Sequence, residues 1–465
     1  MIQLHIITSN RCKPVFMRKV ITYGTYDLLH QGHINLLRRA KELGDYLIVG
    51  VTSDRYDRER GKLNVCNNIL KRIEAVKQTG FADEIIIEDY VGQKIDDIQR
   101  YEINTFAIGS DWEGKFDYLQ EYCEVAYLSR TEGISSTMLR ENDQITYKLG
   151  IIGTGRIARR FIPEIDFVNG VEAYSVLNPV DRAEALAFGK EFNLTEVHTV
   201  FDDFIKNVDA VYIASPHLTH FDYTKNALLA GKHVLCEIPF VLDGDQARTL
   251  YKMAEERRLV LLEASKTAHC PAFNHLITLV KSGVIGDVVD VRSSLSKLSY
   301  GKLRELDASQ AGGSITELSP FPLLSIIKLL GTNYQDVLFY SKIENGVDVF
   351  TKGIINYGNA VSTITLGLGV KTEGNLVISG TKGYVYVPSP WWKTDFFELR
   401  YEDQNKNKKY FYTYEGEGLR YELQEFITMI NTGRLSSYRL RRTESVIIAD
   451  IIGKYIRGDN VTILK

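Results

Sequence analysis

The chain has 465 residues, more than one hydrophobic core usually takes, since domains commonly contain about 100–200 residues. It is 44% hydrophobic and 25% charged, and its formal net charge of −3 gives no indication of binding to nucleic acid or to an anionic membrane. No apolar run approaches the ~20 residues that span a bilayer, so we expect no membrane insertion.

The cysteines indicate a reducing compartment. There are five, an odd number, and none forms a CxxC pair. This pattern favours neither a disulfide framework nor a zinc site, so we predict no structural metal and a cytoplasmic protein. Residues 1–16 contain Arg11 and Lys13, but their apolar stretch is too short for a signal peptide. We interpret them as a tail or a misassigned start, because Met17 directly precedes the first strand.

Residues 17–141 are predicted to alternate between strands and helices. A helix is expected over 34–43, between strands at 20–23 and 46–51, with further strands at 84–88 and 105–109. Alternation of this kind predicts an α/β domain with a parallel sheet, on which ligands bind at the carboxyl ends of the strands. Asp27, His30 and His33 follow the first strand and are therefore predicted to lie at a binding site.

Two imidazoles lie three residues apart in His30-Gln31-Gly32-His33, where the first strand meets a helix that starts near Gly32. About a hundred residues later comes Arg130-Thr131-Glu132-Gly133-Ile134-Ser135-Ser136-Thr137. Helix N-termini attract anions, and imidazoles with a guanidinium can neutralise charge that develops on phosphoryl oxygens. The pattern therefore favours a triphosphate site. The alternative is that both histidines are ordinary surface residues at a helix start.

Four stretches carry a family resemblance: Tyr23 to His33, Ala40 to Leu47, Asp111 to Asp117 and Arg130 to Ser135. Over roughly residues 18–140 the chain resembles the glycerol-3-phosphate cytidylyltransferases of the HxGH nucleotidyltransferase superfamily. The resemblance implies attack by a polyol phosphate, such as glycerol 3-phosphate, on the α-phosphorus of CTP, with Mg²⁺ shared by the triphosphate. Pyrophosphate leaves and CDP-glycerol forms. An adenylyltransferase is the alternative, because HxGH occurs across the superfamily.

The same resemblance implies catalytic roles for His30, His33, Arg130 and Lys62, the last as a side chain that reaches a phosphate. A solvated basic face is the alternative for Lys62 and for Arg72. The tract Asn64 to Leu70 departs from the family pattern. The residues expected to bind CTP or the acceptor are Tyr23, Gly24, Thr25, Tyr26, Asp27, Gly32, Asp54, Arg72, Asp111, Trp112, Thr131, Glu132, Ile134, Ser135, Ser136 and Thr137.

A polar stretch, Arg140 to Gln144, indicates a domain boundary near 141–146. The next strand, Lys148 to Ile152, runs into Gly153-Thr154-Gly155-Arg156-Ile157-Ala158, which opens a helix. In such a GxGxxA turn the glycines allow a tight bend and close approach of a pyrophosphate. The sequence therefore predicts a second domain that binds a dinucleotide.

Three further stretches, 211–220, 230–239 and 311–318, together with the glycine turn, resemble the Gfo/Idh/MocA oxidoreductases. The resemblance implies a Rossmann domain over 147–266 and an α/β domain over 267–465, with helices from about Leu419. The open sheet of the last domain is expected within about 285–395. Because this sheet often mediates assembly in the family, we expect a homo-oligomer.

NAD or NADP is the implied cofactor. An acidic residue after the second strand of this domain favours NAD and an arginine favours NADP, but this chain has Asn178, which leaves the choice open. For His220, expected near the nicotinamide, a structural role is the alternative. The residues expected to bind the cofactor are Gly153, Thr154, Gly155, Arg156, Ile157, Asn178, Ser215, Pro216, His220, Glu237 and Pro239.

The acid–base residues depart from the family pattern. Where the family has Glu-Lys-Pro, this chain has Glu237-Ile238-Pro239, and the downstream acid–base positions carry Glu317 and Phe321. Isoleucine and phenylalanine cannot transfer a proton, so Lys266 and Glu317 become the candidate donors. A salt-bridged Lys266 is the alternative, as is a second domain that serves only as a nucleotide-binding or oligomerisation scaffold.

We interpret the chain as two fused enzymes, in which a reductase could supply the polyol phosphate that the transferase activates. Teichoic acid or capsule synthesis in a bacterium is the expected setting.

Overall fold

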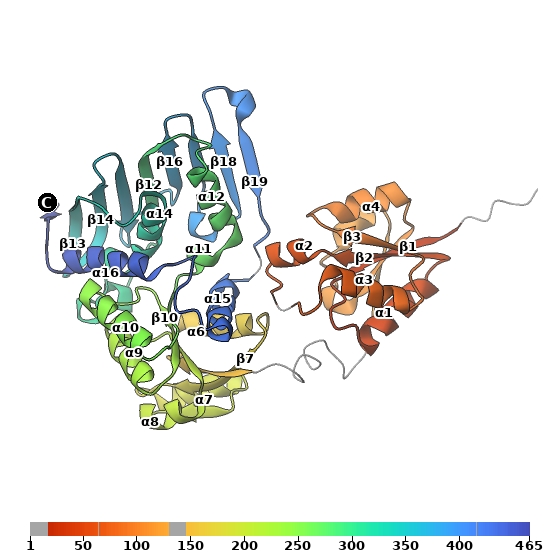
Figure 1. Cartoon of the computed structure of the whole chain (residues 1–465), viewed down its shortest axis with the longest axis horizontal. Helices are drawn as coiled ribbons and strands as arrows, with labels where there is room; N and C mark the ends of the chain where they lie inside the picture. Colours follow the sequence, from red (N-terminus) through yellow and green to blue (C-terminus); the bar gives the residue numbers. More distant parts are fainter. Residues whose placement is uncertain (1–16, 64, 130–145, 415) are drawn as a thin grey trace, which may run out of the picture. The chain divides into compact units, whose positions relative to one another are not determined.

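The computed structural model describes residues 17–63, 65–129, 146–414 and 416–465 (Figure 1). The chain divides into two compact units, one of residues 1–58 and 65–143 and the other of residues 59–64 and 144–465. Among the described residues, no helix is long and apolar enough to cross a membrane.

The first unit contains a five-stranded parallel sheet in the order β3-β2-β1-β4-β5. Its strands are β1 (Lys19–Gly24), β2 (Tyr46–Thr52), β3 (Glu84–Glu88), β4 (Thr105–Gly109) and β5 (Glu124–Leu128). Its helices are α1 (Gln31–Glu42), α2 (Asp54–Glu59), α3 (Ile69–Gln78) and α4 (Gln93–Tyr101), with short 3₁₀ turns η1 (Ser110–Trp112) and η2 (Asp117–Glu121). The predicted alternation and parallel sheet are confirmed.

Two apolar layers cover this sheet. Leu37 and Ala40 of α1 and Val76 of α3 pack on one face, and Ile98 of α4 packs on the other. Strands covered on both faces are apolar throughout, which explains the continuous run of β2. Strands β2 and β3 lie on one side of β1, and strands β4 and β5 lie on the other side. The direction in which successive strands are added to the sheet therefore reverses beside β1. Ligands bind at the carboxyl ends of the strands at such a reversal.

The second unit begins with a six-stranded parallel sheet in the order β11-β10-β9-β6-β7-β8. Its strands are β6 (Tyr147–Ile152), β7 (Val171–Leu177), β8 (Glu196–His198), β9 (Ala210–Ile213), β10 (His233–Glu237) and β11 (Leu261–Ala264). Its helices are α6 (Arg156–Ile165), α7 (Arg182–Glu191), α8 (Phe201–Phe204), α9 (His220–Leu229) and α10 (Gly244–Glu256), with 3₁₀ turns η3 (Ile205–Asn207) and η4 (His217–Thr219). This order is that of a dinucleotide-binding Rossmann fold.

A nine-stranded mixed sheet follows, in the order β19-β18-β17-β16-β12-β15-β14-β13-β20. Its strands are β12 (Val288–Ser296), β13 (Asp336–Glu344), β14 (Val347–Asn356), β15 (Val361–Gly367), β16 (Leu376–Gly380), β17 (Tyr384–Val387), β18 (Phe396–Arg400), β19 (Lys408–Phe411) and β20 (Val461–Ile463). The helices are α11 (Lys266–His269), α12 (Pro271–Lys281), α13 (Ser314–Leu318), α14 (Pro320–Leu330), α15 (Leu419–Thr432) and α16 (Arg442–Ile456), with 3₁₀ turns η5 (Arg304–Leu306), η6 (Ala308–Gln310), η7 (Trp391–Lys393) and η8 (Gln404–Lys406).

The predicted limit of this sheet, 285–395, is too narrow. Strands β18, β19 and β20 lie beyond residue 395, and β20 joins the edge by pairing parallel with β13. These three strands are short, and the charged Lys408-Lys409 pair in β19 gives a weak strand signal. The helices predicted from about Leu419 are present as α15 and α16.

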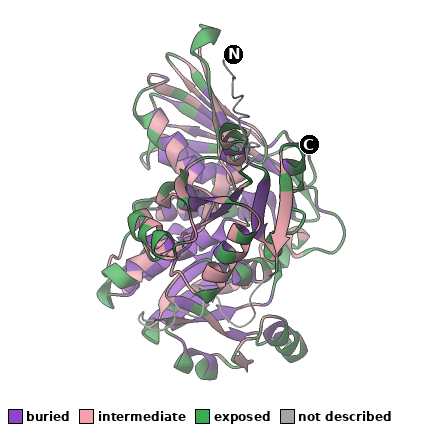
Figure 2. Ribbon diagram, turned by 90° about the vertical axis from the view of Figure 1, so that its right-hand side faces the viewer, coloured by how far each residue is buried: buried purple, intermediate pink, exposed green. Residues whose placement is uncertain are grey.

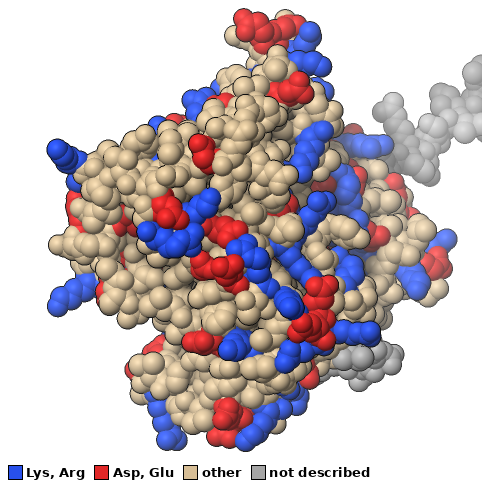
Figure 3. Space-filling model, turned by 60° about the vertical axis from the view of Figure 1, so that its left-hand side comes forward, with Lys and Arg blue, Asp and Glu red and all other residues tan. Residues whose placement is uncertain are grey.

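The last two helices connect the layers of the second unit. In Figure 1, α15 lies beside α6 on the six-stranded sheet, where Leu423 and Phe426 join its core. α16 packs against α10 and α14. Figure 2 shows the buried residues concentrated in the strands, with exposed residues along the outer faces of the helices. On the face in Figure 3, basic and acidic side chains are interspersed, as expected for a small net charge.

Candidate active sites

The two histidines of the first unit lie together at the start of α1. His30 is the N-cap residue, and its Nδ1 accepts a hydrogen bond from the Gly32 N–H at 3.1 Å. The rings of His30 and His33 stack with centroids 4.0 Å apart and planes inclined by 20°. Because Nδ1 of His30 is an acceptor, a neutral ring carries its proton on Nε2. The first turn of α1 contains no acidic residue, so nothing there neutralises the positive end of the helix dipole.

Backbone strain precedes this helix. Tyr26 and Leu28 have φ values of +52° and +44°, in a region that large side chains rarely adopt. The Tyr26 ring is buried and meets His33 edge-on, with centroids 5.6 Å apart. A Cβ on Gly24 would lie 2.9 Å from that ring. Strain of this kind accumulates at functional sites, where surrounding contacts hold it. Here it places both histidines at the carboxyl end of β1.

A buried ion-pair cluster holds the segments around the histidines. Arg72 donates to the carbonyl oxygens of Thr25 (2.7 Å) and Thr52 (2.8 Å), at the ends of β1 and β2. It also pairs with Asp54 at 2.5 Å and with Asp57 at 3.4 Å. The Arg72 side chain has no exposed surface. The prediction that Arg72 reaches a phosphate is therefore corrected, because its guanidinium is occupied inside the fold.

Three further residues of the predicted site, Asp54, Thr25 and Asp27, form contacts within the fold. Asp54 pairs with Arg72, and Thr25 donates to Asp57 at 3.0 Å, a carboxylate that the sequence did not single out. The Asp27 carboxylate accepts the backbone N–H groups of Cys66 and Asn67, both at 2.9 Å. These contacts fix the loops on which the predicted site depends.

Removing the Arg72 guanidinium is expected to destabilise the first unit. Arg72→Met leaves Asp54 and Asp57 without their buried cation, and breaking such a pair on one side costs about 3–5 kcal/mol. The measurement is the free energy of opening at the amides of β1, followed by hydrogen exchange. Lys77→Ala, on the exposed face of α3, should change it by less than about 0.5 kcal/mol. A loss equal to that of the control would show that the cluster contributes nothing.

Tyr23 does not face the histidines. Its hydroxyl donates to Asp97 at 2.8 Å, and its ring packs on Phe106 in the layer opposite α1. Burial, reinforced by Asp97, raises the pKa of Tyr23. The expectation that this side chain binds substrate is corrected, since both ring and hydroxyl belong to the core.

Other predicted residues are distributed as follows. Asp111 and Trp112 follow β4, the neighbour of β1, and Trp112 is 41% exposed with the Lys115 ammonium over its ring at 4.9 Å. Lys62 lies in residues 59–64 of the second unit. Outside the described residues lie Arg130, Thr131, Glu132, Ile134, Ser135, Ser136 and Thr137.

The glycine turn of the second unit is shaped for close backbone approach. Gly153 has φ of +103°, and a Cβ there would lie 2.6 Å from the Ala214 carbonyl oxygen. Gly155 caps α6 without a side-chain hydrogen bond, and a Cβ there would meet nothing within 4 Å. The N-terminus of α6 therefore has no side-chain cap and leaves room beside Gly155, an arrangement that fits a pyrophosphate. Arg156 and Ile157 form its first turn.

Asn178 lies beside this turn, as predicted for a residue at the end of β7. Its amide nitrogen donates to Thr154 at 3.0 Å, and its oxygen accepts the N–H groups of Val180 and Asp181 at 3.1 Å. The neutral amide is thus fixed in the loop and adds no charge that would select NAD or NADP.

We expect Gly153→Ala to weaken dinucleotide binding by at least about 10-fold, because the new methyl group collides with backbone at an unfavourable φ that costs about 1–3 kcal/mol. NADH fluorescence titration gives the dissociation constant. Gly231→Ala is a matched control, since φ there is +76° but nothing lies within 4 Å of a Cβ. Unchanged affinity in Gly153→Ala would remove the turn from the binding site.

His220 has a structural position. It is buried, with Nδ1 2.9 Å from the Pro239 carbonyl oxygen and Nε2 2.8 Å from that of Ser215. Ser215 also contacts Thr219 through their hydroxyls at 2.7 Å. The predicted contact of His220 with a nicotinamide is corrected, because both ring nitrogens face backbone carbonyls that tie the end of β9 to the segment after β10.

Glu237 and Lys266 lie in one buried region. The Glu237 carboxylate accepts from the Tyr212 hydroxyl and from the Ile238 N–H, and burial raises its pKa to about 7. The Lys266 ammonium donates to the backbone carbonyl oxygen of Glu417 at 3.0 Å and lies 3.8 Å from the side-chain carboxylate of Glu417. Burial, assisted by Lys393, lowers the pKa of Lys266. Both pKa shifts are toward neutrality, as acid–base catalysis requires.

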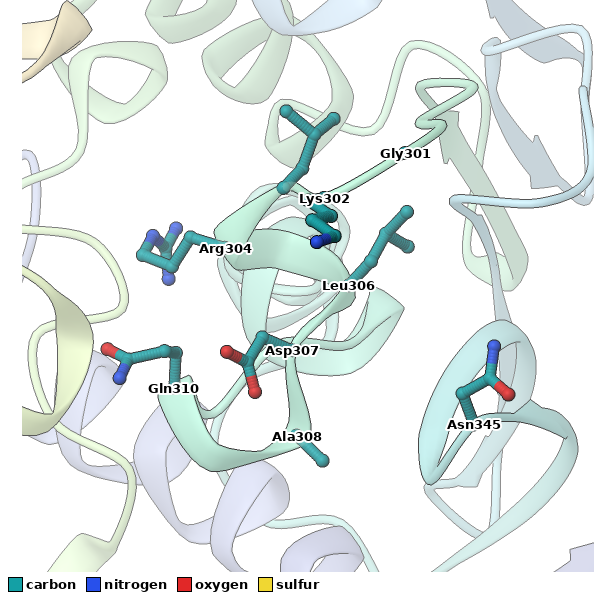
Figure 4. Close-up of a pocket in the computed structure, with 9 residues that line it drawn as sticks. Gly301, Lys302, Arg304, Leu306, Asp307, Ala308, Gln310 and Asn345 are labelled. Carbon is teal, nitrogen blue, oxygen red and sulfur yellow. The ribbon is translucent and has the colours of Figure 1, made fainter.

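Glu317, on α13, is the third candidate acid–base residue. Its carboxylate pairs with Arg304 at 2.8 Å and lies 3.5 Å from Nδ1 of His217, which follows β9. Burial raises the pKa of Glu317 and lowers that of His217. Arg304 lies in the segment from Gly301 to Gln310, which lines a hollow of about 660 Å³ (Figure 4). In that view Asn345 lies across the hollow from Gln310. Sequence reasoning missed Arg304, which carries no motif.

Comparison with known proteins covers both units. The "Cytidylyltransferase-like" family matches residues 21–142, and the GFO_IDH_MocA family, described as "Oxidoreductase family, NAD-binding Rossmann fold", matches residues 147–265. Glycerol-3-phosphate cytidylyltransferase of Bacillus spizizenii is 50% identical over 126 residues, 27% of this chain and 97% of that protein. The chain is a cytidylyltransferase-like domain fused to a Gfo/Idh/MocA-family oxidoreductase domain. It is an enzyme of the nucleotidyltransferase class that carries an oxidoreductase-family module.

Two relatives resemble the oxidoreductase domain over nearly its whole length. Trans-1,2-dihydrobenzene-1,2-diol dehydrogenase of Oryctolagus cuniculus is 26% identical over 324 residues, 67% of this chain and 98% of that protein. A 3-ketoreductase from Actinomadura kijaniata, solved with NADP and TDP-benzene, superposes with a TM-score of 0.62 at 20% identity and covers 70% of this chain and 100% of its own. The structural similarity to this 3-ketoreductase shows that the second unit has the same fold.

Proposed function

We propose that the transferase domain transfers a cytidylyl group from CTP to glycerol 3-phosphate or a related polyol phosphate. The observation that carries the proposal is the stacked His30–His33 pair at the positive end of α1, whose first turn contains no acidic residue. The 50% identity to a glycerol-3-phosphate cytidylyltransferase supports the acceptor. Asp111 and Trp112, after the neighbouring strand, are proposed to shape the nucleoside or acceptor pocket.

The chemistry needs positioning and charge stabilisation. An acceptor phosphate oxygen attacks the α-phosphorus in line, one P–O bond forms, the bond to pyrophosphate breaks, and no covalent enzyme intermediate is required. The Nε2–H of His30 and the ring of His33 donate to phosphoryl oxygens as negative charge moves toward the leaving group. We propose that Arg130 and Lys62 add positive charge, and that Thr131, Glu132, Ile134, Ser135, Ser136 and Thr137 complete the site.

We further propose that Mg²⁺ accompanies CTP. Residues that the structure describes contain no group of three or more His, Cys, Asp or Glu able to hold a metal ion. Mg²⁺ is commonly held mainly by substrate phosphates and water, with one or two carboxylates. The buried Asp27 already accepts two backbone N–H groups, which supports a loop-holding role.

For the oxidoreductase domain we propose NAD(P)H-dependent reduction of a ketose or triose, free or phosphorylated. When bound, the cofactor supplies a hydride to the carbonyl carbon, and the oxygen needs a proton. Ile238 and Phe321 cannot supply it. Lys266 is the proposed donor, with Glu317 as the second candidate, because both are largely buried and have pKa values shifted toward neutrality. A binding-only scaffold is the competing function, favoured by Ile238.

The two halves suggest consecutive reactions. Reduction of a ketose phosphate gives a polyol phosphate, which is the acceptor class of the transferase. We propose that the product serves as a precursor for a surface polymer such as teichoic acid or capsule. A cytoplasmic enzyme is consistent with the cysteines Cys66, Cys123, Cys236 and Cys270, which form no disulfide among the described residues.

A homo-oligomer is also proposed, through the outer face of the nine-stranded sheet. Leu338, Tyr340, Val361 and Tyr384 lie on that face and are each 36–41% exposed. The proposed domains are 17–141, 147–266 and 267–465.

Product analysis tests the acceptor and the nucleotide together. The full chain is incubated with Mg²⁺, CTP or ATP, and a panel of polyol phosphates, and products are identified by mass spectrometry. We expect CDP-glycerol from CTP and glycerol 3-phosphate. An AMP-linked product formed as fast from ATP would make the domain an adenylyltransferase.

A further inference from the structure

A second buried carboxyl group lies beside Glu237 and Lys266. Glu422, in the first turn of α15, has a fully buried side chain. Among the residues that the structure describes, neither of its carboxyl oxygens has a hydrogen-bond partner. A carboxylate without partners is costly to bury, whereas a protonated carboxyl group is far less so.

The packing brings Glu422 to the acid–base region of the oxidoreductase domain. α15 packs against α11, which begins with Lys266, and against β10, which ends with Glu237. Burial raises the pKa of Glu422, the nearby Glu237 raises it further, and Lys266 lowers it. The ionisable groups that act on Glu422 from neighbouring elements are Glu237 on β10, Lys266 on α11, Glu164 on α6, Tyr212 on β9, and Tyr414.

The balance of charges around Glu237, Glu422 and Lys266 keeps one proton on the two carboxyl groups. Glu164 is neutralised by Arg420, with two nitrogen–oxygen contacts of 2.8 Å. Lys266 is then the cation facing the two carboxyl groups Glu237 and Glu422, and it also lies near Glu417. Two adjacent buried carboxyl groups cannot both ionise at neutral pH beside one shared cation, so they retain a proton between them.

We propose that Glu422 is a positioning residue that stores a proton for Lys266, in a chain where Ile238 replaces the usual lysine. The inference rests on the proposed reductase. During reduction, an N–H bond of Lys266 breaks as the substrate O–H bond forms, which leaves a neutral amine. The O–H bond of Glu422 then breaks and an N–H bond forms on Lys266. Solvent protons afterwards restore the Glu422 carboxyl group.

The Lys266 side chain suits such an exchange. Its flexible stem carries an ammonium group that contacts the Glu417 backbone on one side and is influenced by the buried carboxyl pair on the other. The stored proton is local, because α15, which carries Glu422, packs against α11, which begins with Lys266.

Infrared spectroscopy of the apo protein tests the stored proton without catalysis. We expect the C=O stretching band of protonated carboxylic acids at pH 7 in the wild-type chain, and a loss of part of its intensity in Glu422→Gln. Glu425→Gln, one turn further on α15, is the matched control and should keep the band, because Glu425 pairs with Arg434 at 3.3 Å. A band unchanged in Glu422→Gln overturns the proposal.

Kinetics test the relay. Glu422→Gln should lower reductase kcat by roughly 10²-fold above the pKa of Lys266 and less at lower pH, while NADH affinity stays unchanged. Glu422→Asp keeps a carboxyl group and should recover part of the rate; it also serves if the Gln variant does not fold. An active wild-type chain whose pH profile is identical in Glu422→Gln overturns the relay alone. A wild-type chain that binds NADH but reduces no carbonyl substrate overturns both the reductase and the relay.

Discussion

Replacing His33 with alanine is expected to lower kcat for pyrophosphate release by about 10²–10³-fold, the scale of losing one transition-state donor. His33 stacks on His30 at 4.0 Å and lies at the start of α1, where its ring meets the positive end of the helix. The fold should survive, because the apolar layer beneath α1 is formed by Leu37 and Ala40 rather than by His33. Steady-state pyrophosphate release and a thermal unfolding curve measure the two effects.

The control for His33→Ala is Arg38→Ala, an exposed position on the same helix. It should leave the rate and the melting temperature unchanged. Near-normal pyrophosphate release by His33→Ala would remove the HxGH motif from the mechanism, whereas an equal loss in both variants would point to a general defect of α1.

Lys266→Met is expected to abolish hydride transfer and to spare cofactor binding. A positioned acid contributes about 10²–10⁴-fold to proton transfer, and Met keeps the length of the stem while removing the donor. NADH binding should persist because the glycine turn follows β6, which β9 and β10 separate from β11, the strand that precedes Lys266. NADH oxidation with a ketose or triose measures the first effect, and NADH fluorescence measures the second.

Lys225→Met, on the exposed face of α9, is the control for this variant and should retain activity. Full reductase activity in a Lys266→Met, Glu317→Gln double variant would show that neither side chain is the donor. A wild-type chain that leaves NAD(P)H fluorescence unchanged at millimolar cofactor would contradict dinucleotide binding itself.

The sequence predicted those parts of the fold that depend on local pattern. Strands β3 and β4 have the predicted bounds, because short apolar runs between polar segments mark buried parallel strands. The glycine turn could also be predicted from the sequence. Gly153 adopts a positive φ, which few residues other than glycine tolerate. The family resemblances extended this local reading to whole domains.

What the sequence could not predict depends on contacts between distant residues. Arg72 looked like a free cation, yet Asp54 and Asp57 enclose it once α2 and α3 pack at the ends of β1 and β2. Glu422 looked like an ordinary charge on a C-terminal helix, and it becomes buried when α15 packs against α6, α11 and β10. Strand β20 likewise requires the edge of a sheet formed more than a hundred residues earlier.

Pyrophosphate release by the full chain from CTP, measured with and without glycerol 3-phosphate in the presence of Mg²⁺, is the most direct test of the central claim. We predict rapid release that requires both CTP and the polyol phosphate and that falls about 10²–10³-fold in His33→Ala. The account is contradicted if no polyol phosphate supports release, or if release is the same without any acceptor.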